Sequence, residues 1–477
     1  MEDRVEIPAR PHANAWPAVL GDNDRVSAKS RIVIVGGGPG GYEAALVAAQ
    51  LGADVTVVDR DGLGGAAVLT DVVPSKTLIA TADVLATVGG SRQLGIRGLG
   101  RVQADLAAVN RRVKGLARAQ SKDIQRRLEA EGVRIVQGQG VLDGPSRVKV
   151  GDLVIEADTL LISTGASPRE LPDAMPDGER VLNWKQLYDL EELPERLIVV
   201  GSGVTGAEFA SAYHALGAGV ALVSSRDRVL PGEDADAAEV LEHVFRRGGM
   251  EVLSRSRAQS VKRTDAGVVV TLSDGRTVEG SHCLMAVGAV PNTAGLGLEE
   301  AGVRLSPSGH IEVDRVSRTS VRGIYAAGDC TGVFPLASVA AMQGRKAMHH
   351  VLGDAVSPLE LRLVSSNVFT SPEIATVGVT QTQVDGGLEA VAVKLPLATN
   401  PRAKMQGIHD GFVKLFASPS GRVLGGTVVA PRASELIHPI ALAVSARLTV
   451  DEVAAVFTVY PSISGSVAEA ARQLHTS

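Results

Sequence analysis

The glycine spacing near the start of the chain is suited to holding the pyrophosphate of a dinucleotide. Gly36, Gly38 and Gly41 follow an apolar run and precede a helical stretch, and Asp59 ends the next apolar run. Glycines let the backbone turn tightly and approach a pyrophosphate, which the partial positive charge of a helix N-terminus stabilises. Asp59 is placed to accept a hydrogen bond from a ribose hydroxyl. Together these residues predict a dinucleotide site rather than an ordinary glycine-rich turn.

A second fingerprint lies further along the chain. It consists of Gly201, Gly203, Gly206 and the acid Glu208. An NAD site would place an acid at the end of the following strand, but that strand ends in Ser224, Ser225 and Arg226. Without the acid a 2′-phosphate is not repelled, and two hydroxyls and a guanidinium could bind it. The second site therefore favours NADPH or permits both nucleotides, although Arg226 could also be a solvated turn residue.

The elements that position these residues form two strand–turn–helix–strand units. The first comprises a strand over 31–35, a helix over 42–51 and a strand over 54–58; the second has strands over 197–200 and 220–223. A charged helix is expected over 102–131, and short strands near 133–136 and over 159–162. After residue 354 hairpin-like strands over 411–416 and 423–429 precede two closing helices, the second opened by a Thr449–Glu452 capping box. The fold class is α/β, with two doubly wound Rossmann-like dinucleotide-binding domains and a C-terminal α+β domain.

Composition excludes several other kinds of protein. The 48 Lys and Arg against 53 Asp and Glu leave a net charge of −5, which makes nucleic acid an improbable partner. The two cysteines, Cys283 and Cys330, form no CxxC, so a disulfide framework, a zinc ribbon and an iron–sulfur cluster are excluded. No His-rich ligand set predicts a metal. The longest apolar run, 437–450, is interrupted by charge, so no membrane span is expected, and residues 1–30 are expected to be a flexible tail. We expect a cytoplasmic enzyme.

Two nucleotide folds in one chain suggest one tightly held cofactor and one exchanging nucleotide, with a flavin to carry electrons between them. Further motifs resemble the flavoprotein pyridine nucleotide–disulfide oxidoreductases, which include lipoamide dehydrogenase, glutathione reductase and mercuric reductase. The segments concerned are 325–330, 336–338, 163–165, 288–292 and 371–378. The resemblance implies an FAD domain over 31–178 and 290–352, an NAD(P) domain over 179–289, and a homodimerisation domain over 355–477.

The same resemblance assigns further contacts. Besides the first glycine cluster and Asp59, it implies that FAD is bound by Gly65, Lys76, Val141, Thr164, Asp329 and Ala337. Gly288 joins the NAD(P) set. Lys76 matches the family lysine beside flavin N5, and Glu208 matches its ion-pair partner; the alternative is that Lys76 is a solvated helix lysine.

The chain departs from this family where the disulfide chemistry resides. The family segment G-G-T-C-L-N-V-G-C-I-P-S-K reads here as Gly64 to Lys76, with Ala67 and Val72 in place of both redox cysteines. The family His–Glu pair near the C-terminus is replaced by Tyr460 and Gly465. Neither Ala nor Val can form a thiolate, and a phenol is a poor base at neutral pH. Cys283 and Cys330 lie in other motifs, so we expect them to be buried, small apolar residues.

The resulting expectation is an FAD-dependent NAD(P)H:quinone oxidoreductase, in which electrons pass from flavin to a flat acceptor without a disulfide. Its catalytic residues would be Lys76, Glu208 and Tyr460, the last acting if a second subunit contributes it, as the family histidine is contributed. One alternative is a soluble pyridine nucleotide transhydrogenase, because the missing strand-end acid fits the use of both nucleotides. Another is a catalytically degenerate lipoamide dehydrogenase paralogue in which FAD is structural.

Overall fold

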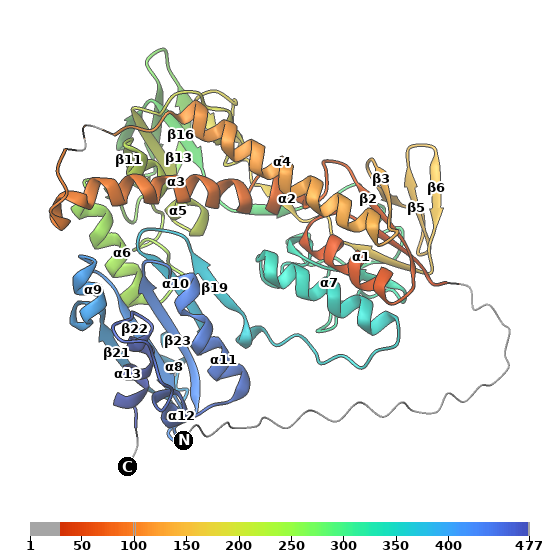
Figure 1. The fold of residues 1–477 in the computed structure, drawn as a ribbon. Coiled ribbons are helices and arrows are strands. Elements are labelled where there is room, and N and C mark those ends of the chain that lie inside the picture. Colours follow the sequence, from red (N-terminus) through yellow and green to blue (C-terminus); the bar gives the residue numbers. More distant parts are fainter. Residues whose placement is uncertain (1–28, 99, 101, 476–477) are drawn as a thin grey trace, which may run out of the picture.

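A computed structural model describes residues 29–98, 100 and 102–475, so the predicted tail falls almost entirely outside the described residues. The first unit, which carries the labelled strands β2 and β3 in Figure 1, is a parallel sheet in the order β18-β7-β1-β2-β3. Its strands are β1 (Arg31–Val35), β2 (Asp54–Asp59), β3 (Arg134–Gln137), β7 (Thr159–Ile162) and β18 (Ile324–Ala326). The alternating apolar residues of β1 give it two buried faces. Ile32 and Ile34 pack under α1 (Pro39–Gln50), α4 (Leu106–Ala130) and α7 (Ala337–Val351). Val33 and Val35 pack beneath a small antiparallel sheet.

That covering sheet consists of β4 (Val141–Leu142), β5 (Arg147–Val150) and β6 (Leu153–Glu156).

The second unit has the same arrangement of a parallel sheet between helices and a small antiparallel sheet. Its parallel sheet has the order β12-β11-β10-β16-β9, with β10 (Arg196–Val200) between β11 (Gly219–Val223) and β16 (His282–Met285). The edge strands are β9 (Val181–Leu182) and β12 (Glu251–Leu253). Helices α5 (Val204–Leu216) and α6 (Ala235–Arg247) cover one face. The other face is covered by the antiparallel strands β13 (Ala258–Arg263), β14 (Val268–Leu272) and β15 (Thr277–Gly280).

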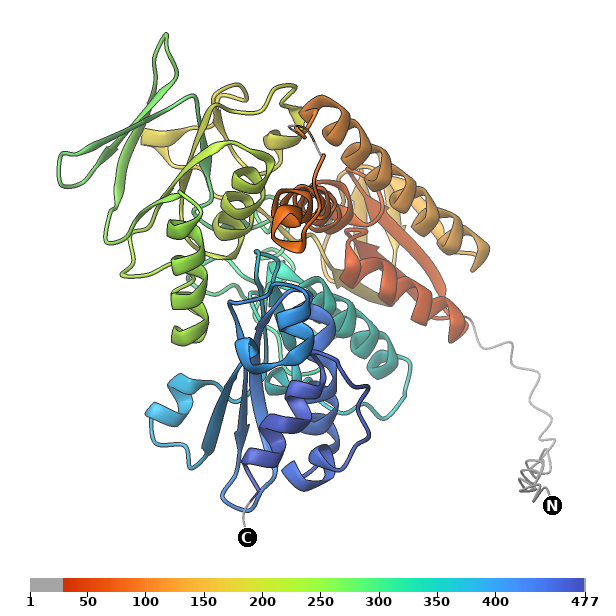
Figure 2. The same cartoon turned by 60° about the vertical axis from the view of Figure 1, so that its left-hand side comes forward.

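The third unit is an antiparallel sheet in the order β19-β20-β23-β22-β21. Its strands are β19 (Ser365–Val368), β20 (Glu373–Gly378), β21 (Val391–Pro396), β22 (Phe412–Ala417) and β23 (Val423–Ala430). One face carries α11 (His438–Ala446) and α13 (Gly465–Gln473). The other face is turned toward the second unit (Figure 2). It joins the core of that unit, because Phe412 and Val429 pack in the same cluster as α5. The predicted fold class of two parallel-sheet units and a C-terminal α+β unit is confirmed.

Two element predictions need correction. More helices close the chain than the expected two. After β23 come α10 (Ala433–Leu436), α11, α12 (Val450–Ala454) and α13, and the Thr449–Glu452 capping box opens the short α12. The segment 65–94 is also long and apolar enough, by length and composition, to cross a membrane, contrary to expectation. It is divided, however, into α2 (Gly65–Leu69), α3 (Val72–Gly90) and the 3₁₀ turn Ser91–Leu94, and α3 packs against α4 and α5.

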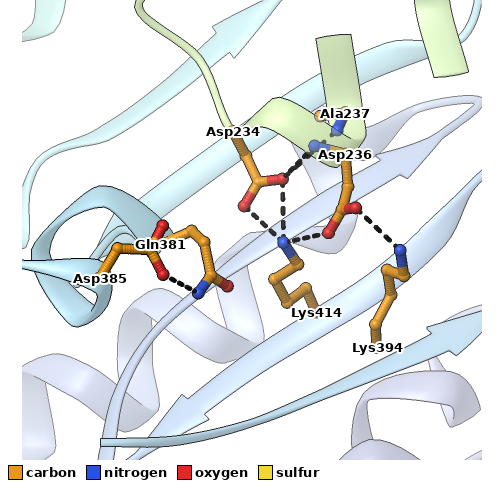
Figure 3. Close-up of polar contacts among 7 residues, drawn as sticks. All are labelled: Asp234, Asp236, Ala237, Gln381, Asp385, Lys394 and Lys414. Atoms are coloured by element: carbon orange, nitrogen blue, oxygen red, sulfur yellow. Dashed lines mark hydrogen bonds and ion pairs between the residues drawn. The ribbon is translucent and has the colours of Figure 1, made fainter. Parts of the chain in front are cut away.

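A buried ion cluster ties the second unit to the third (Figure 3). Lys414 on β22 has a side chain only 4 % exposed, and its Nζ lies 2.7 and 3.0 Å from the two carboxylate oxygens of Asp234. Asp234 also caps α6 by accepting hydrogen bonds from the amides of Asp236 and Ala237. Asp236 accepts from Lys414 and, at 2.9 Å, from Lys394. The N-terminus of α6 is therefore fixed to the sheet of the third unit.

Candidate flavin and nicotinamide sites

The first glycine cluster shapes the turn between β1 and α1. Gly36 has a φ of 103°, and a Cβ there would lie 2.2 Å from the carbonyl oxygen of Ser163. Gly38 differs, since it has an ordinary φ of −66° and a Cβ there would meet nothing within 4 Å. Because Gly38 has no side chain, the space in front of the N-terminus of α1 stays open, and a phosphate could approach the backbone closely there. The residues present therefore fit a dinucleotide.

A cavity of about 360 Å³ lies beside this turn, at the carboxyl ends of β1 and β2. Its lining includes Gly36, Asp59 and Thr164, three of the residues expected to contact FAD. Asp59 accepts hydrogen bonds from the backbone amide of Gly37 at 2.6 Å and from those of Asp61 and Gly62. These bonds fix its carboxylate at the mouth of the cavity, where a ribose hydroxyl would reach it.

The remaining expected FAD residues lie on elements around the same unit. Asp329 follows β18 in a 3₁₀ turn (Asp329–Thr331), and burial raises the pKa of its carboxyl group. Ala337 is the first residue of α7, whose start therefore offers unpaired amides. Val141 begins β4. Gly65 begins α2, and a Cβ built there would lie 2.8 Å from the Cα of Gly38.

Lys76 and Glu208 form the central polar contact between the first two units. The Lys76 Nζ lies 2.7 Å from Glu208 Oε2, and the Glu208 side chain is only 4 % exposed. Glu208 Oε1 accepts a hydrogen bond of 2.9 Å from the backbone amide of Phe369, and Lys76 Nζ lies 4.8 Å from the centre of the Phe369 ring. Lys76 is thus not a solvated helix lysine. The pair joins α3, α5 and the segment after β19, one element from each unit.

At the second glycine cluster the open position is Gly203, where a Cβ would again meet nothing within 4 Å. Gly201 and Gly206 are instead required by packing, since a Cβ at Gly206 would lie 1.8 Å from the carbonyl oxygen of Gly201. Gly288 is exposed at the carboxyl end of the β16 strand, where a nucleotide bound at this turn would reach. The second cluster thus has the same geometry as the first.

The structure corrects one proposed phosphate contact. Ser224 is fully buried, and its Oγ lies 2.7 Å from Ser202 Oγ and donates toward the carbonyls of the following turn. Its hydroxyl therefore holds the turn and does not face a nucleotide. Ser225 and Arg226 are exposed, as a phosphate contact requires. Exposure fits equally well the alternative that Arg226 is a solvated turn residue. The sequence pattern does not single out Arg228, whose buried Nε has no partner among the described residues.

The structure does not bring Tyr460 to Lys76 within one chain. Tyr460 lies between α12 and α13 and is 82 % exposed, beside the exposed Phe457 and Val459. It belongs to an apolar surface segment of the third unit, on the other side of that unit's sheet from α5. A catalytic role for Tyr460 therefore requires a second subunit.

The two cysteines are buried and free, as expected. Cys283 lies within β16, where burial raises the pKa of its thiol far above the usual range. Burial also raises the pKa of Cys330 to about 11, and its thiol donates to the carbonyl of Ala327. At the family's redox positions stand the half-buried Ala67 and Val72. Within the described part of the chain, no cysteine pair can exchange a disulfide, and no cluster of possible metal ligands occurs.

Comparison with known proteins agrees with this geometry. Residues 30–344 match the pyridine nucleotide-disulphide oxidoreductases, and residues 364–471 match their dimerisation domain. The chain is 56 % identical over 462 residues to an NAD(P)H dehydrogenase (quinone) of Mycobacterium tuberculosis, covering 93 % of this chain and 94 % of that protein. It is 33 % identical over 459 residues to the dihydrolipoyl dehydrogenase of Chlorobaculum tepidum, covering 94 % and 97 %.

Solved structures extend the comparison. The crystal structure of LpdA from M. tuberculosis superimposes with a TM-score of 0.89 at 55 % identity, covering 94 % of this chain and 100 % of that chain. The flavoprotein disulfide reductase RclA of Escherichia coli, at 24 % identity and a TM-score of 0.84 over 93 % of this chain and 100 % of that chain, shares the fold. This chain is a member of the pyridine nucleotide–disulphide oxidoreductase family that lacks the redox cysteine pair.

Proposed function

We propose that this protein is an FAD-dependent NAD(P)H:quinone oxidoreductase that transfers electrons without a disulfide. The observation that carries the proposal is the intact Lys76–Glu208 pair in a chain whose redox positions are Ala67 and Val72. When bound, FAD would accept a hydride from the nicotinamide and pass its electrons to an acceptor. The name of the 56 % identical relative in M. tuberculosis supports a quinone as that acceptor.

Different residues of the chain would bind FAD and stabilise the charge of its reduced state. Gly38 and the start of α1 would hold the FAD pyrophosphate, with Asp59 on the ribose. Lys76, held by Glu208, would place a positive charge beside flavin N5 and favour the negatively charged reduced state. The small side chains at 67 and 72 leave the facing side of the flavin accessible to a flat molecule.

The NAD(P)H site is proposed at the start of α5, with Gly203 at the phosphate and Gly288 near the nicotinamide. Because the end of β11 carries no acid, either nucleotide is accommodated, and Ser225 and Arg226 favour NADPH through its 2′-phosphate.

A homodimer is part of the proposal, since the dimerisation domain matches over residues 364–471. The run of exposed apolar side chains at Val456, Phe457, Val459 and Tyr460 is the surface expected at such an interface. The second subunit would thereby deliver Tyr460 to the acceptor. A cytoplasmic location is also proposed.

The test is anaerobic reduction of the purified flavoprotein by NADPH, followed by addition of menadione. We expect the flavin absorbance to bleach with no long-wavelength thiolate charge-transfer band, and then to return promptly. Recovery with NAD⁺ but not with menadione would instead support the transhydrogenase, which the missing acid at the end of β11 also fits. No bleaching with either nucleotide would contradict both activities.

A further inference from the structure

Asp71 is an acid that neither the nucleotide sites nor the Lys76–Glu208 pair employs. It stands between Ala67 and Val72, the two positions where the family carries its cysteines, and the family motif has glycine there. Asp71 is the residue before α3, and its backbone amide donates to the carbonyl of Ala66 at 2.8 Å. The connection from α2 to α3 therefore holds Asp71 directly beside the positions where the family carries its cysteines.

The Asp71 side chain forms no hydrogen bond within the neighbouring helix. It does not cap α3, and among the described residues its carboxylate accepts no hydrogen bond. The hydroxyl of the neighbouring Thr70 is buried and has no partner either. An acid at a helix start ordinarily bonds to the first amides of that helix. The Asp71 carboxylate itself is half-buried and is not among the buried atoms that lack a partner, so a molecule outside the protein chain can reach it.

The charged and titratable groups around Asp71 come from every element packed against it. Lys76 on α3 and Lys185 before the 3₁₀ turn Gln186–Asp189 favour its ionised form, whereas Glu208 on α5 and Asp329 oppose it. The buried Tyr188 also faces Asp71, and burial keeps its phenol neutral by raising its pKa. Burial dominates, and raises the pKa of Asp71 to about 6.

We infer that Asp71 is the catalytic acid that protonates the reduced acceptor. This inference rests on the proposed quinone reductase activity and supplies its missing step. A quinone needs two electrons and two protons to become a hydroquinone. The bound flavin would supply two electrons and one of these protons as a hydride equivalent. The second proton passes from the Asp71 carboxyl to the acceptor oxygen, where one O–H bond breaks and another forms, and water then reprotonates the carboxylate.

No other side chain assigned to the acceptor is as well suited. Lys76 is occupied by Glu208, and a Tyr460 delivered by the second subunit would offer a phenol, which is ordinarily a much weaker acid than a carboxyl group. A carboxyl group whose pKa lies near the working pH can both give up a proton and regain it, which is the requirement for a general acid.

The experiment compares the wild type with Asp71→Asn, which keeps the shape of the side chain but cannot supply the proton. Stopped-flow measurements separate flavin reduction by NADPH from its reoxidation by menadione. We expect Asp71→Asn to leave the reduction rate unchanged and to slow reoxidation by about 100-fold, a typical contribution of a general acid. The wild-type reoxidation rate should fall as the pH rises above about 6, and the Asp71→Asn rate should not.

The matched control is Asp83→Asn, which removes a carboxylate from the same helix about three turns away and should change neither rate. Asp71→Glu should recover part of the lost rate. A readout independent of turnover is the infrared C=O band of a protonated carboxylic acid, recorded with and without FAD. It should titrate near pH 6 in the wild type and be missing in Asp71→Asn.

The possible outcomes distinguish failure of the proposed role of Asp71 from failure of the proposed quinone reductase activity. If menadione fails to reoxidise the wild type, the quinone reductase activity is refuted and the role of Asp71 with it. If the wild type turns over but Asp71→Asn reoxidises at the same rate with the same pH profile, the role of Asp71 alone is refuted. An infrared band that persists in Asp71→Asn would also overturn it, because the titrating acid would then be another residue.

Discussion

Replacing Lys414 by methionine should loosen the junction between the second and third units far more than replacing Lys394. The side chains of Lys414 and Asp234 are 4 % and 3 % exposed, and their charged atoms lie 2.7 Å apart. Methionine has similar length and no charge, so the substitution leaves Asp234 buried without its cation. Breaking a buried pair in this way costs about 3–5 kcal/mol. Because Asp234 keeps its hydrogen bonds to the amides of α6, we expect about 3 kcal/mol.

Lys394→Met is the matched control. Lys394 binds Asp236 of the same cluster (Figure 3), at 2.9 Å. Its side chain, however, is 47 % exposed. Exposed ion pairs contribute about 0–1 kcal/mol, so this variant should remain close to the wild type. Asp236 also stays paired with Lys414 in that variant.

The assay is guanidinium denaturation followed by the fluorescence of Trp184, which is buried in the second unit, with Trp16 replaced by phenylalanine in every variant so that Trp184 alone is observed. A chain of three units need not unfold in one step, so the first transition seen by Trp184 is the one compared. The double variant Asp234→Asn/Lys414→Met should recover much of the loss, because no unpaired charge remains. Equal losses in Lys414→Met and Lys394→Met would refute the reasoning, since burial would then not be the cause.

Three further predictions concern the sites. Gly38→Leu should abolish FAD retention, measured by the yellow absorbance of the purified protein. Gly203→Leu should retain FAD but weaken NADPH binding about tenfold or more, measured by fluorescence titration. Lys76→Met should slow flavin reduction by about 100-fold and destabilise the chain by about 3 kcal/mol, because Glu208 is left buried and unpaired; unchanged reduction would contradict its electrostatic role. Asp71→Asn should raise the melting temperature at pH 8 but not at pH 4. Burial raises the pKa of Asp71 from about 4 in the unfolded chain to about 6, so stability that is present at low pH is lost as the pH rises through this range, by about 3 kcal/mol in total.

The repeated βαβ units could be predicted because their determinants are local. The β1 and β7 strands begin and end where the apolar runs predict, and β2 and β10 extend them by a single residue. The helix after the first glycine turn begins at Pro39 rather than Tyr42, since proline is favoured in a first turn and the turn glycines can join the helix. The Lys76–Glu208 pair is predicted by family resemblance alone, because nothing in the spacing joins residues so distant in sequence.

The wrongly predicted or unpredicted residues depend on partners that only the fold supplies. The place of Ser224 at a strand end predicts a phosphate contact, but the Ser202 hydroxyl of the preceding turn reaches it first. Asp71 does not stand out in the sequence, because an acid before a helix has an ordinary explanation as a cap. Its unusual environment arises from α5 and the turn at Asp329, which lie far away in the sequence.

The positions of the lost cysteines explain why the family fold survives without its disulfide. Ala67 and Val72 are half-buried, while Val68, Pro74 and Ser75 between and after them make the buried contacts of α2 and α3. Exchanging cysteine for a residue of similar size at a half-buried position opens no large cavity, so the stability of the units changes little. Replacing Lys76 would instead be costly, because the Glu208 carboxylate would be left buried without its cation where the three units meet. The residues at the two cysteine positions could therefore change with little structural consequence, whereas the Lys76–Glu208 pair is built into the packing of the protein.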